Sequence, residues 1–299
     1  MEEEDIYSSP WDNFASVIAD NLGVDPQHIH PQHSFQEMGG TSLNLVSTVL
    51  KLQQSGIPIT LEQFLTAGSI EQVLLQASLP TLQPKFLLKP LSQVSHSDQR
   101  AAQELLAQSF LHKTELFTLC GNMTLADFLN AYSSWWHIFQ EYSFVIVDQA
   151  DKLRAAVLAA DQLVIDEAQP DESFHPHLCA IFQMLKEVTA ITQQQLNPLG
   201  KPRQILSKFM MGASLENTAE ENVIAFTMME KELMEVAKRD GFSATMAENI
   251  SPLTQQLSEY LGCKRYLTVY LRNWTDPSGA RPFANCSEDY SVTVDVYHV

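Results

Sequence analysis

Apolar residues recur at helical spacing through residues 1–78, which predicts a small four-helix bundle. The first helix opens at Ser9-Pro10, carries one apolar stripe and ends at Gly23. Two phrases of the form S/T-x-x-Q are typical of capping boxes and indicate where the last two helices begin. The helices are expected to start at Pro10, Ser42, Thr60 and Ser69.

The next segment interrupts this pattern. Leu79-Pro80-Thr81-Leu82-Gln83-Pro84 contains two prolines and no helical periodicity, so we predict an extended linker at 79–84. Six residues span at most about 20 Å, which keeps the bundle close to the domain that follows. A group tethered at that range reaches a high effective concentration at a neighbouring site.

From residue 85 strands alternate with helices, and we predict a mixed α/β domain over 85–299. Ser97 and Thr124 are expected to cap two amphipathic helices. Thr218-x-x-Glu221 has the form of a capping box and predicts a long helix that ends near Arg239. The predicted strands lie at 86–91, 143–147, 153–159, 204–211, 241–246, 264–273 and 291–298.

Composition and charge limit the possible functions. A chain of 299 residues with 45% hydrophobic content can form two domains with real cores. The net charge is −18, and residues 1–80 hold ten acids against one base. This distribution argues against nucleic-acid binding and favours docking on basic patches of partner enzymes, with solubility alone as the other interpretation.

The same composition bears on location. No apolar run is long enough to span a bilayer, and the acidic first residues are unlike a signal peptide. The cysteines form no C-x-x-C pair, so we expect reduced thiols in a cytoplasmic protein. They are Cys120, Cys179, Cys263 and Cys286.

The main chemical candidate is Gly39-Gly40-Thr41-Ser42-Leu43. The helical spacing after it places Ser42 at a helix N-terminus, where backbone N–H groups and the helix dipole favour a phosphate. Together with Ser34-Phe35-Gln36-Glu37-Met38 and the four-helix order, this segment resembles peptidyl carrier domains. The resemblance implies a 4'-phosphopantetheine attached covalently to Ser42 by a phosphopantetheinyl transferase. The alternative is an ordinary helical domain in which Ser42 is only an N-cap.

The element order of residues 85–299 resembles the GCN5-related N-acyltransferase fold. The insect arylalkylamine N-acyltransferases contain a phrase similar to Phe110-Leu111-His112-Lys113-Thr114-Glu115-Leu116-Phe117. On that match Glu115 occupies the position of the catalytic glutamate, the base that takes a proton from the amine. The resemblance also implies two hydroxyls near the substrate and a splayed strand that bonds the pantetheine arm. These residues are Ser251, Thr254, Met210, Met211 and Gly212.

Each of these residues also has a structural interpretation. Glu115 can be a surface carboxylate that follows a helix, and the two hydroxyls can cap one. The methionines Met210, Met211, Met228 and Met229 can line an adaptable pocket for an aromatic amine or simply pack in the core.

One departure from the family pattern concerns the donor. CoA-dependent members carry a basic, glycine-rich loop that holds the pyrophosphate, but Ser214-Leu215-Glu216-Asn217-Thr218-Ala219-Glu220-Glu221 has three acids and no Arg or Lys. Carboxylates at that place repel a pyrophosphate. We therefore expect free acyl-CoA to be a poor donor, and a thioester on Ser42 to replace it.

A carrier domain followed by an amine-selecting domain resembles the insect β-alanyl-biogenic amine synthetases. The resemblance implies transfer of a β-alanyl group from Ser42 to an amine such as dopamine or histamine, with loading by an upstream adenylation domain outside this chain. The alternative is a carrier fused to an inactive, acyltransferase-like interaction domain. A peptide-forming condensation domain is disfavoured because no H-H-x-x-x-D-G phrase occurs, and a thioesterase because no G-x-S-x-G phrase does. The histidines lack ligands at metal-binding spacing, so no metal site is expected.

Overall fold

The computed structural model describes residues 10–57, 59–77, 86–118, 123–168 and 174–299. The chain forms two compact units, residues 1–83 and residues 84–299. The predicted linker at 79–84 lies outside the described residues. No helix in the described part of the chain is long and apolar enough to cross a membrane.

The first unit is a helical bundle. Its helices are α1 (Pro10–Leu22), α2 (Ser42–Gln54), α3 (Leu61–Thr66) and α4 (Ile70–Gln76), with a 3₁₀ turn at Pro26–His28. Thr60 and Ser69 accept hydrogen bonds from the third residue of α3 and of α4, so both predicted caps are confirmed. The stripe predicted in the first helix faces the core. The largest fully buried side chains of this unit are Phe14, Ile18, Leu52, Ile59, Leu61 and Ile70.

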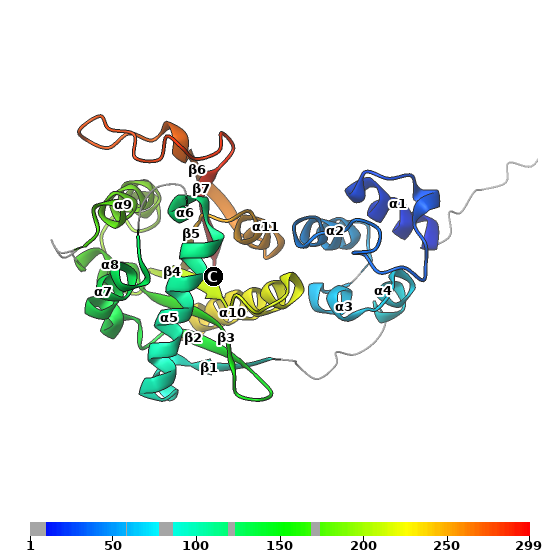
Figure 1. Cartoon of the computed structure of the whole chain (residues 1–299), viewed down its shortest axis with the longest axis horizontal. Coiled ribbons are helices and arrows are strands. Elements are labelled where there is room, and N and C mark those ends of the chain that lie inside the picture. The colour runs from blue at the N-terminus through cyan, green and yellow to red at the C-terminus, as the bar shows by residue number, and fades with distance from the viewer. Residues whose placement is uncertain (1–9, 58, 78–85, 119–122, 169–173) are drawn as a thin grey trace, which may run out of the picture. The chain divides into compact units, whose positions relative to one another are not determined.

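The second unit is built on a seven-stranded sheet with the order β1-β2-β3-β4-β5-β7-β6. The strands are β1 (Phe86–Pro90), β2 (Phe144–Asp148), β3 (Leu153–Asp161), β4 (Ile205–Ala213), β5 (Ala244–Asn249), β6 (Lys264–Tyr270) and β7 (Ser291–His298). The helices are α5 (His96–Lys113), α6 (Glu115–Thr118), α7 (Leu125–Trp135), α8 (Gln162–Glu167), α9 (Pro176–Leu196), α10 (Ala219–Asp240) and α11 (Pro252–Tyr260) (Figure 1).

The pairing of β4 with β5 departs from the rest of the sheet. These two strands run parallel, whereas every other described neighbouring pair is antiparallel. Their register runs from Ile205↔Ala244 to Lys208↔Ala247 and stops there, although β4 continues to Ala213. The two strands therefore part beyond Lys208.

Helices cover both faces of the sheet. Lys208 of β4 forms an ion pair with Glu230 of α10, while its neighbour Phe209 contacts the rings of Trp135 in α7 and Phe182 in α9. These contacts place α10 on one face of the sheet and α7 and α9 on the other (Figure 1).

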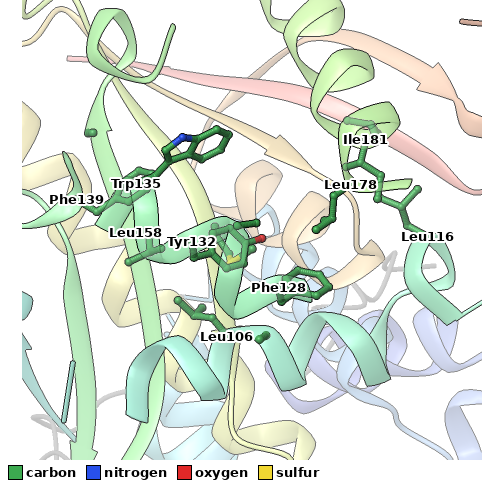
Figure 2. Close-up of a cluster of buried hydrophobic side chains, with 14 of the residues drawn as sticks. Leu106, Leu116, Phe128, Tyr132, Trp135, Phe139, Leu158, Leu178 and Ile181 are labelled. Carbon is green, nitrogen blue, oxygen red and sulfur yellow. The ribbon is translucent and has the colours of Figure 1, made fainter. Parts of the chain in front are cut away.

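A large hydrophobic cluster fills the space between the sheet and the helices α5, α7 and α9. Figure 2 shows Phe128 and Tyr132 of α7 between Leu106 of α5 and Leu178 of α9. The hairpin strands predicted at 143–147 and 153–159 contribute Val145, Ala156 and Leu158. This cluster fixes α7 and α9 against the strands that part.

Some predicted boundaries are wrong. The cap of α5 is Ser95, whose hydroxyl accepts from the Asp98 backbone N–H, so Ser97 lies inside the helix. Strand β5 begins at Ala244 rather than at Gly241, because Gly241 ends α10 with a φ of 78°. The short helix α8 was not predicted.

Candidate functional site

Ser42 is the first residue of α2. The N-cap is Thr41, whose hydroxyl accepts from the Asn44 backbone N–H at 3.4 Å while Asn44 Oδ1 accepts from the Thr41 N–H at 2.5 Å. The interpretation of Ser42 as only an N-cap is therefore wrong, because Thr41 has that role. A phosphate on Ser42 would lie in the first turn of α2, where the helix dipole favours negative charge.

Two glycines shape the loop that leads to Ser42. Gly39 has a φ of 88°, a conformation that strains any other residue. A Cβ on Gly40 would lie 2.5 Å from the Phe35 carbonyl oxygen and closer still to the Phe35 ring. Phe35 is buried and packs edge-on against Phe64, with 5.2 Å between ring centroids. The loop is thus held against the bundle at Phe35, and only glycine fits where it crosses that ring.

In the second unit, the gap between β4 and β5 opens into a cavity of about 240 Å³, which we name the splay cavity. The β5-facing backbone of residues 209–212 has no strand partner in the described register. Such an edge can bond the amides of an extended ligand. The residues that line the cavity include Ser109, Phe110, Met210, Met211, Ser251 and Thr254.

The structure brings four of the predicted site residues together at this cavity. Met210 and Met211 line it from β4, and both are buried. Ser251 and Thr254 line it from the start of α11. Ser251 is also the N-cap of α11, because its Oγ accepts from the Thr254 backbone N–H at 3.1 Å, and the two hydroxyl oxygens lie 3.0 Å apart.

Gly212 is not among the residues that line the splay cavity. A Cβ there would lie 3.0 Å from Ser109 Cβ and 3.2 Å from Leu106 Cδ2. The glycine therefore allows α5 to approach β4 closely. Its structural role is packing, and a role in binding the arm stays a prediction.

Glu115 starts α6, next to Thr114, which lines the splay cavity. Its carboxylate accepts from the Ser287 hydroxyl at 2.8 Å and from the Ser287 backbone N–H at 3.0 Å. It thus ties α6 to the connection between β6 and β7. Glu115 lines neither the splay cavity nor the aromatic cavity described next, and its catalytic role stays a prediction.

A second cavity, of about 360 Å³, lies on the α7 and α9 side of the sheet, and we name it the aromatic cavity. Its walls include Trp135, Phe182 and Phe209, whose ring centroids lie 5.1 to 6.2 Å apart. Two carboxylates, Asp166 and Glu248, also line it. Aromatic walls with carboxylates suit an aromatic molecule that carries a positive charge.

The two cavities share three lining residues, Leu185, Phe209 and Glu248. The last paired residues of the parting strands are Lys208 and Ala247, so Phe209 and Glu248 are the first residues beyond the pairing. The two cavities are therefore adjacent where the strands separate. The three shared side chains belong to the wall between the two cavities.

Glu248 is partly buried at this junction, and its Oε1 accepts from the Thr189 hydroxyl at 2.6 Å. Burial raises the pKa of Glu248, and the Thr189 hydrogen bond and Lys208 oppose that rise only in part. The sequence reasoning missed Glu248 and Asp166. Strand β5 (Ala244–Asn249) has three apolar residues among its six, and the only charged residue beside them was the available signal for Glu248.

The loop between β4 and α10 differs from its sequence-based description. Lys152 and Arg154 of the β2–β3 hairpin form ion pairs with Glu216, and Lys152 holds the pKa of that carboxyl below its usual range. At the helix start, Glu221 accepts from the Thr218 backbone N–H and the Thr218 hydroxyl accepts from that of Glu221. One of the three acids, Glu216, is thus paired with bases, but two of the N–H groups that a pyrophosphate would use are already bonded.

Comparison with known proteins gives the class of each unit. Residues 13–75 match the family described as a phosphopantetheine attachment site. The second unit shares its fold with solved N-acetyltransferases, among them the polyamine N-acetyltransferase of Drosophila melanogaster, with a TM-score of 0.54 and 15% identity over 72% of this chain and 100% of that one. The chain thus joins a helical unit that matches a phosphopantetheine attachment site to a seven-stranded unit with the fold of these N-acetyltransferases.

Within this class the chain is Ebony-like. It is 25% identical over 278 residues to the β-alanyl-bioamine nonribosomal peptide synthetase Ebony of Drosophila melanogaster, which is 88% of this chain and 31% of that protein. The chain therefore spans about a third of the length of this relative. Its second unit is similar to the C-terminal condensation domain of Ebony in complex with β-alanyl-dopamine, with a TM-score of 0.64 and 24% identity over 72% of this chain and 99% of that one.

Proposed function

We propose that this chain transfers a β-alanyl group from a phosphopantetheine thioester on Ser42 to a biogenic amine such as dopamine or histamine, forming an amide. The observation that carries the proposal is the presence, in one chain, of a carrier domain and an acyltransferase-fold domain whose parting strands lie beside two adjacent cavities. The likeness to a condensation domain solved with β-alanyl-dopamine supports this pair of substrates.

The residues present fit a pantetheine arm. The unpaired edge of 209–212 offers backbone groups to its amides, and Met210 and Met211 offer apolar walls. When bound, the arm supplies the acyl group as a thioester, whose C–S bond breaks as the amide C–N bond forms. We infer that Ser251 and Thr254, which line the same cavity, hydrogen-bond the acyl group or the arm.

The donor is the carrier rather than free acyl-CoA. A phosphate that is already bonded to Ser42 needs no pyrophosphate loop, and the loop at 214–221 uses its N–H groups on its own side chains. Further partners are an adenylation domain that loads β-alanine and a phosphopantetheinyl transferase. The described cysteines Cys179, Cys263 and Cys286 form no disulfide, which fits a cytoplasmic setting.

The transfer needs an uncharged amine, so a group of the protein must take its proton. The family likeness implies Glu115 for this role. Substitution of Glu115 by Gln is expected to slow transfer without preventing the loading of Ser42, and an unchanged transfer rate would remove Glu115 from the mechanism.

A direct experiment loads the chain from β-alanyl-CoA with a phosphopantetheinyl transferase, then adds dopamine or histamine and follows the carrier by mass spectrometry. We expect loss of the β-alanyl mass from the arm together with appearance of the amide. Ser42→Ala is the matched control and should accept no arm. If the β-alanyl group stays on the arm with every amine tried, the enzyme function is refuted and the second candidate, an inactive interaction domain, remains. That candidate is favoured by the loop at 214–221, whose N–H groups bond to side chains of the loop itself.

A further inference from the structure

The connection between β6 and β7, residues 271–290, is long but anchored in the second unit (Figure 1). Phe283 and Cys286 of this connection are buried in the hydrophobic cluster. The Cys286 N–H donates to the Phe283 carbonyl at 3.1 Å, and the Tyr290 N–H donates to the Ser287 carbonyl at 3.2 Å. Ser287 therefore follows a buried residue in a backbone that is bonded on both sides of it.

The short helix α6 is fixed by α9. His177 of α9 bonds through Nε2 to the Leu116 carbonyl oxygen at 3.1 Å, and Leu116 is fully buried. Because a carbonyl oxygen only accepts, Nε2 carries the hydrogen. The same ring packs edge-on against Phe283 of the connection, with 5.7 Å between centroids. His177 thus holds α6 and the connection in one frame.

Glu115 and Ser287 meet in this frame. The Ser287 Oγ lies 2.8 Å from each of the two Glu115 carboxylate oxygens, and the Ser287 N–H donates to Oε2 at 3.0 Å. The last torsion of a glutamate side chain is broad, so a carboxylate on its own rotates easily. A hydroxyl between both oxygens and an N–H on one of them fix that rotation.

The same contacts leave the carboxylate able to accept a proton. A carboxylate offers about four acceptor sites, and one hydroxyl and one N–H occupy only part of that capacity. Glu115 is half-buried and Ser287 is exposed, so solvent reaches this pair. A proton taken up by Glu115 can therefore pass on to water.

Resting on the role proposed above for Glu115, we propose that Ser287 is a positioning residue for the acyl transfer and holds the Glu115 carboxylate in the orientation in which it takes a proton from the amine. The ammonium ion gives one proton to Glu115, and the neutral nitrogen bonds to the acyl carbon. The C–S bond breaks, and the second proton leaves with the sulfur as a thiol. Glu115 then returns its proton to water, and Ser287 keeps its own proton throughout.

Three variants test the hydroxyl of Ser287. Ser287→Ala removes it and leaves the N–H, whereas Ser287→Thr keeps a hydroxyl at the same place. Ser278→Ala is the matched control, because Ser278 is an exposed serine of the same connection whose Oγ donates to Asp276 Oδ1 at 2.6 Å. Each full-length chain is loaded with the β-alanyl arm on Ser42 and mixed with dopamine, and mass spectrometry follows a single turnover.

We expect Ser287→Ala to load normally but to transfer at least about tenfold more slowly at saturating dopamine, since a small misplacement of a catalytic group is costly. The dopamine concentration that gives half the maximal rate should change less than about twofold, because the lost contact acts in the transition state rather than in binding. Ser287→Thr should restore most of the rate, and Ser278→Ala should match the unsubstituted chain.

A double variant separates positioning from a merely structural role. In a chain that already carries Glu115→Gln, Ser287→Ala should lower the rate less than about twofold further, because no carboxylate is left to position. If Ser287 only ties α6 to the connection, its loss should lower the rate by the same factor with and without Glu115.

The outcomes distinguish this inference from the function on which it rests. If the loaded, unsubstituted chain transfers nothing to any amine, the proposed function fails, and the role of Ser287 fails with it. If Glu115→Gln transfers at the full rate, the transfer function stands but the roles of Glu115 and Ser287 are both overturned. If Glu115→Gln is slow, the role of Ser287 alone is overturned by a Ser287→Ala variant as fast as Ser278→Ala, by a Ser287→Thr variant as slow as Ser287→Ala, or by equal factors in the double variant.

Discussion

Substitution by alanine should destabilise the loop before Ser42 for a different physical reason at each of its two glycines. Gly39→Ala leaves open space around the new Cβ but strains the backbone, because φ is 88°. Gly40→Ala has no such φ but places the Cβ against the Phe35 ring and 2.5 Å from the Phe35 carbonyl oxygen, where it cannot stay. One substitution costs backbone strain and the other costs packing.

The structure gives the magnitudes. A single non-glycine residue in the left-handed region costs about 1 to 2 kcal/mol, which is the expectation for Gly39→Ala. Gly40→Ala must move the loop, which breaks the hydrogen bond from the Gly40 N–H to the Phe35 carbonyl, worth about 1 kcal/mol. It also displaces Phe35, whose burial contributes about 1.5 to 3 kcal/mol. The expected cost is about 3 kcal/mol.

Hydrogen-exchange mass spectrometry of the full chain can measure the cost of each substitution. Peptides that cover α2 report the stability of the first unit separately from that of the second. Gly40→Ala should raise the exchange of the 35–52 region well above that of Gly39→Ala. The rate at which a phosphopantetheinyl transferase modifies Ser42 should fall in the same order. Equal protection of the two variants, within about 0.5 kcal/mol, would refute the packing argument.

Two further predictions concern the second unit. Lys208→Met leaves Glu230 buried without its partner, which should cost about 3 to 5 kcal/mol and lower the calorimetric Tm. Lys238→Met, which removes an exposed ion pair of α10, should change the Tm little. Equal Tm values for the two variants would contradict this reasoning. Phe182→Ala removes a ring from the aromatic cavity and should raise KM for dopamine severalfold, since such ring contacts contribute about 1 kcal/mol. Ser42 should still load in this variant. An unchanged KM would exclude this cavity as the amine site.

The fold was predictable where its determinants are local in sequence. The caps at Thr60, Ser69 and Thr218 depend on a hydroxyl and a partner three residues later, so a short phrase contains the whole interaction. The cap of α5 shows the limit of this reasoning. Ser95 and Ser97 both offer a hydroxyl, and the choice depends on how the preceding chain leaves β1, which a short phrase does not contain.

The site was predictable only in part, because its other determinants are distant in sequence. Thr189 is 59 residues from Glu248, and Lys152 is 64 residues from Glu216. The loop at 214–221 contains no base of its own, yet the hairpin β2–β3 brings two bases to it. Local sequence thus gives the chemistry available at a position, but the charge there depends on which strands become neighbours.

The end of the pairing between β4 and β5 is the place where we expect the acyl donor and the amine acceptor to meet. A fully paired sheet separates its two faces, since backbone hydrogen bonds close the space between strands. Here pairing stops at Lys208↔Ala247, and the next residues on the two strands, Phe209 and Glu248, line both cavities. Under the proposed function, the opening that frees a strand edge for the arm also borders the aromatic cavity, where we expect the amine to bind. Glu248 is the first residue of β5 beyond its pairing with β4, while β5 stays paired with β7, so the opening lies on the β4 side of β5 alone.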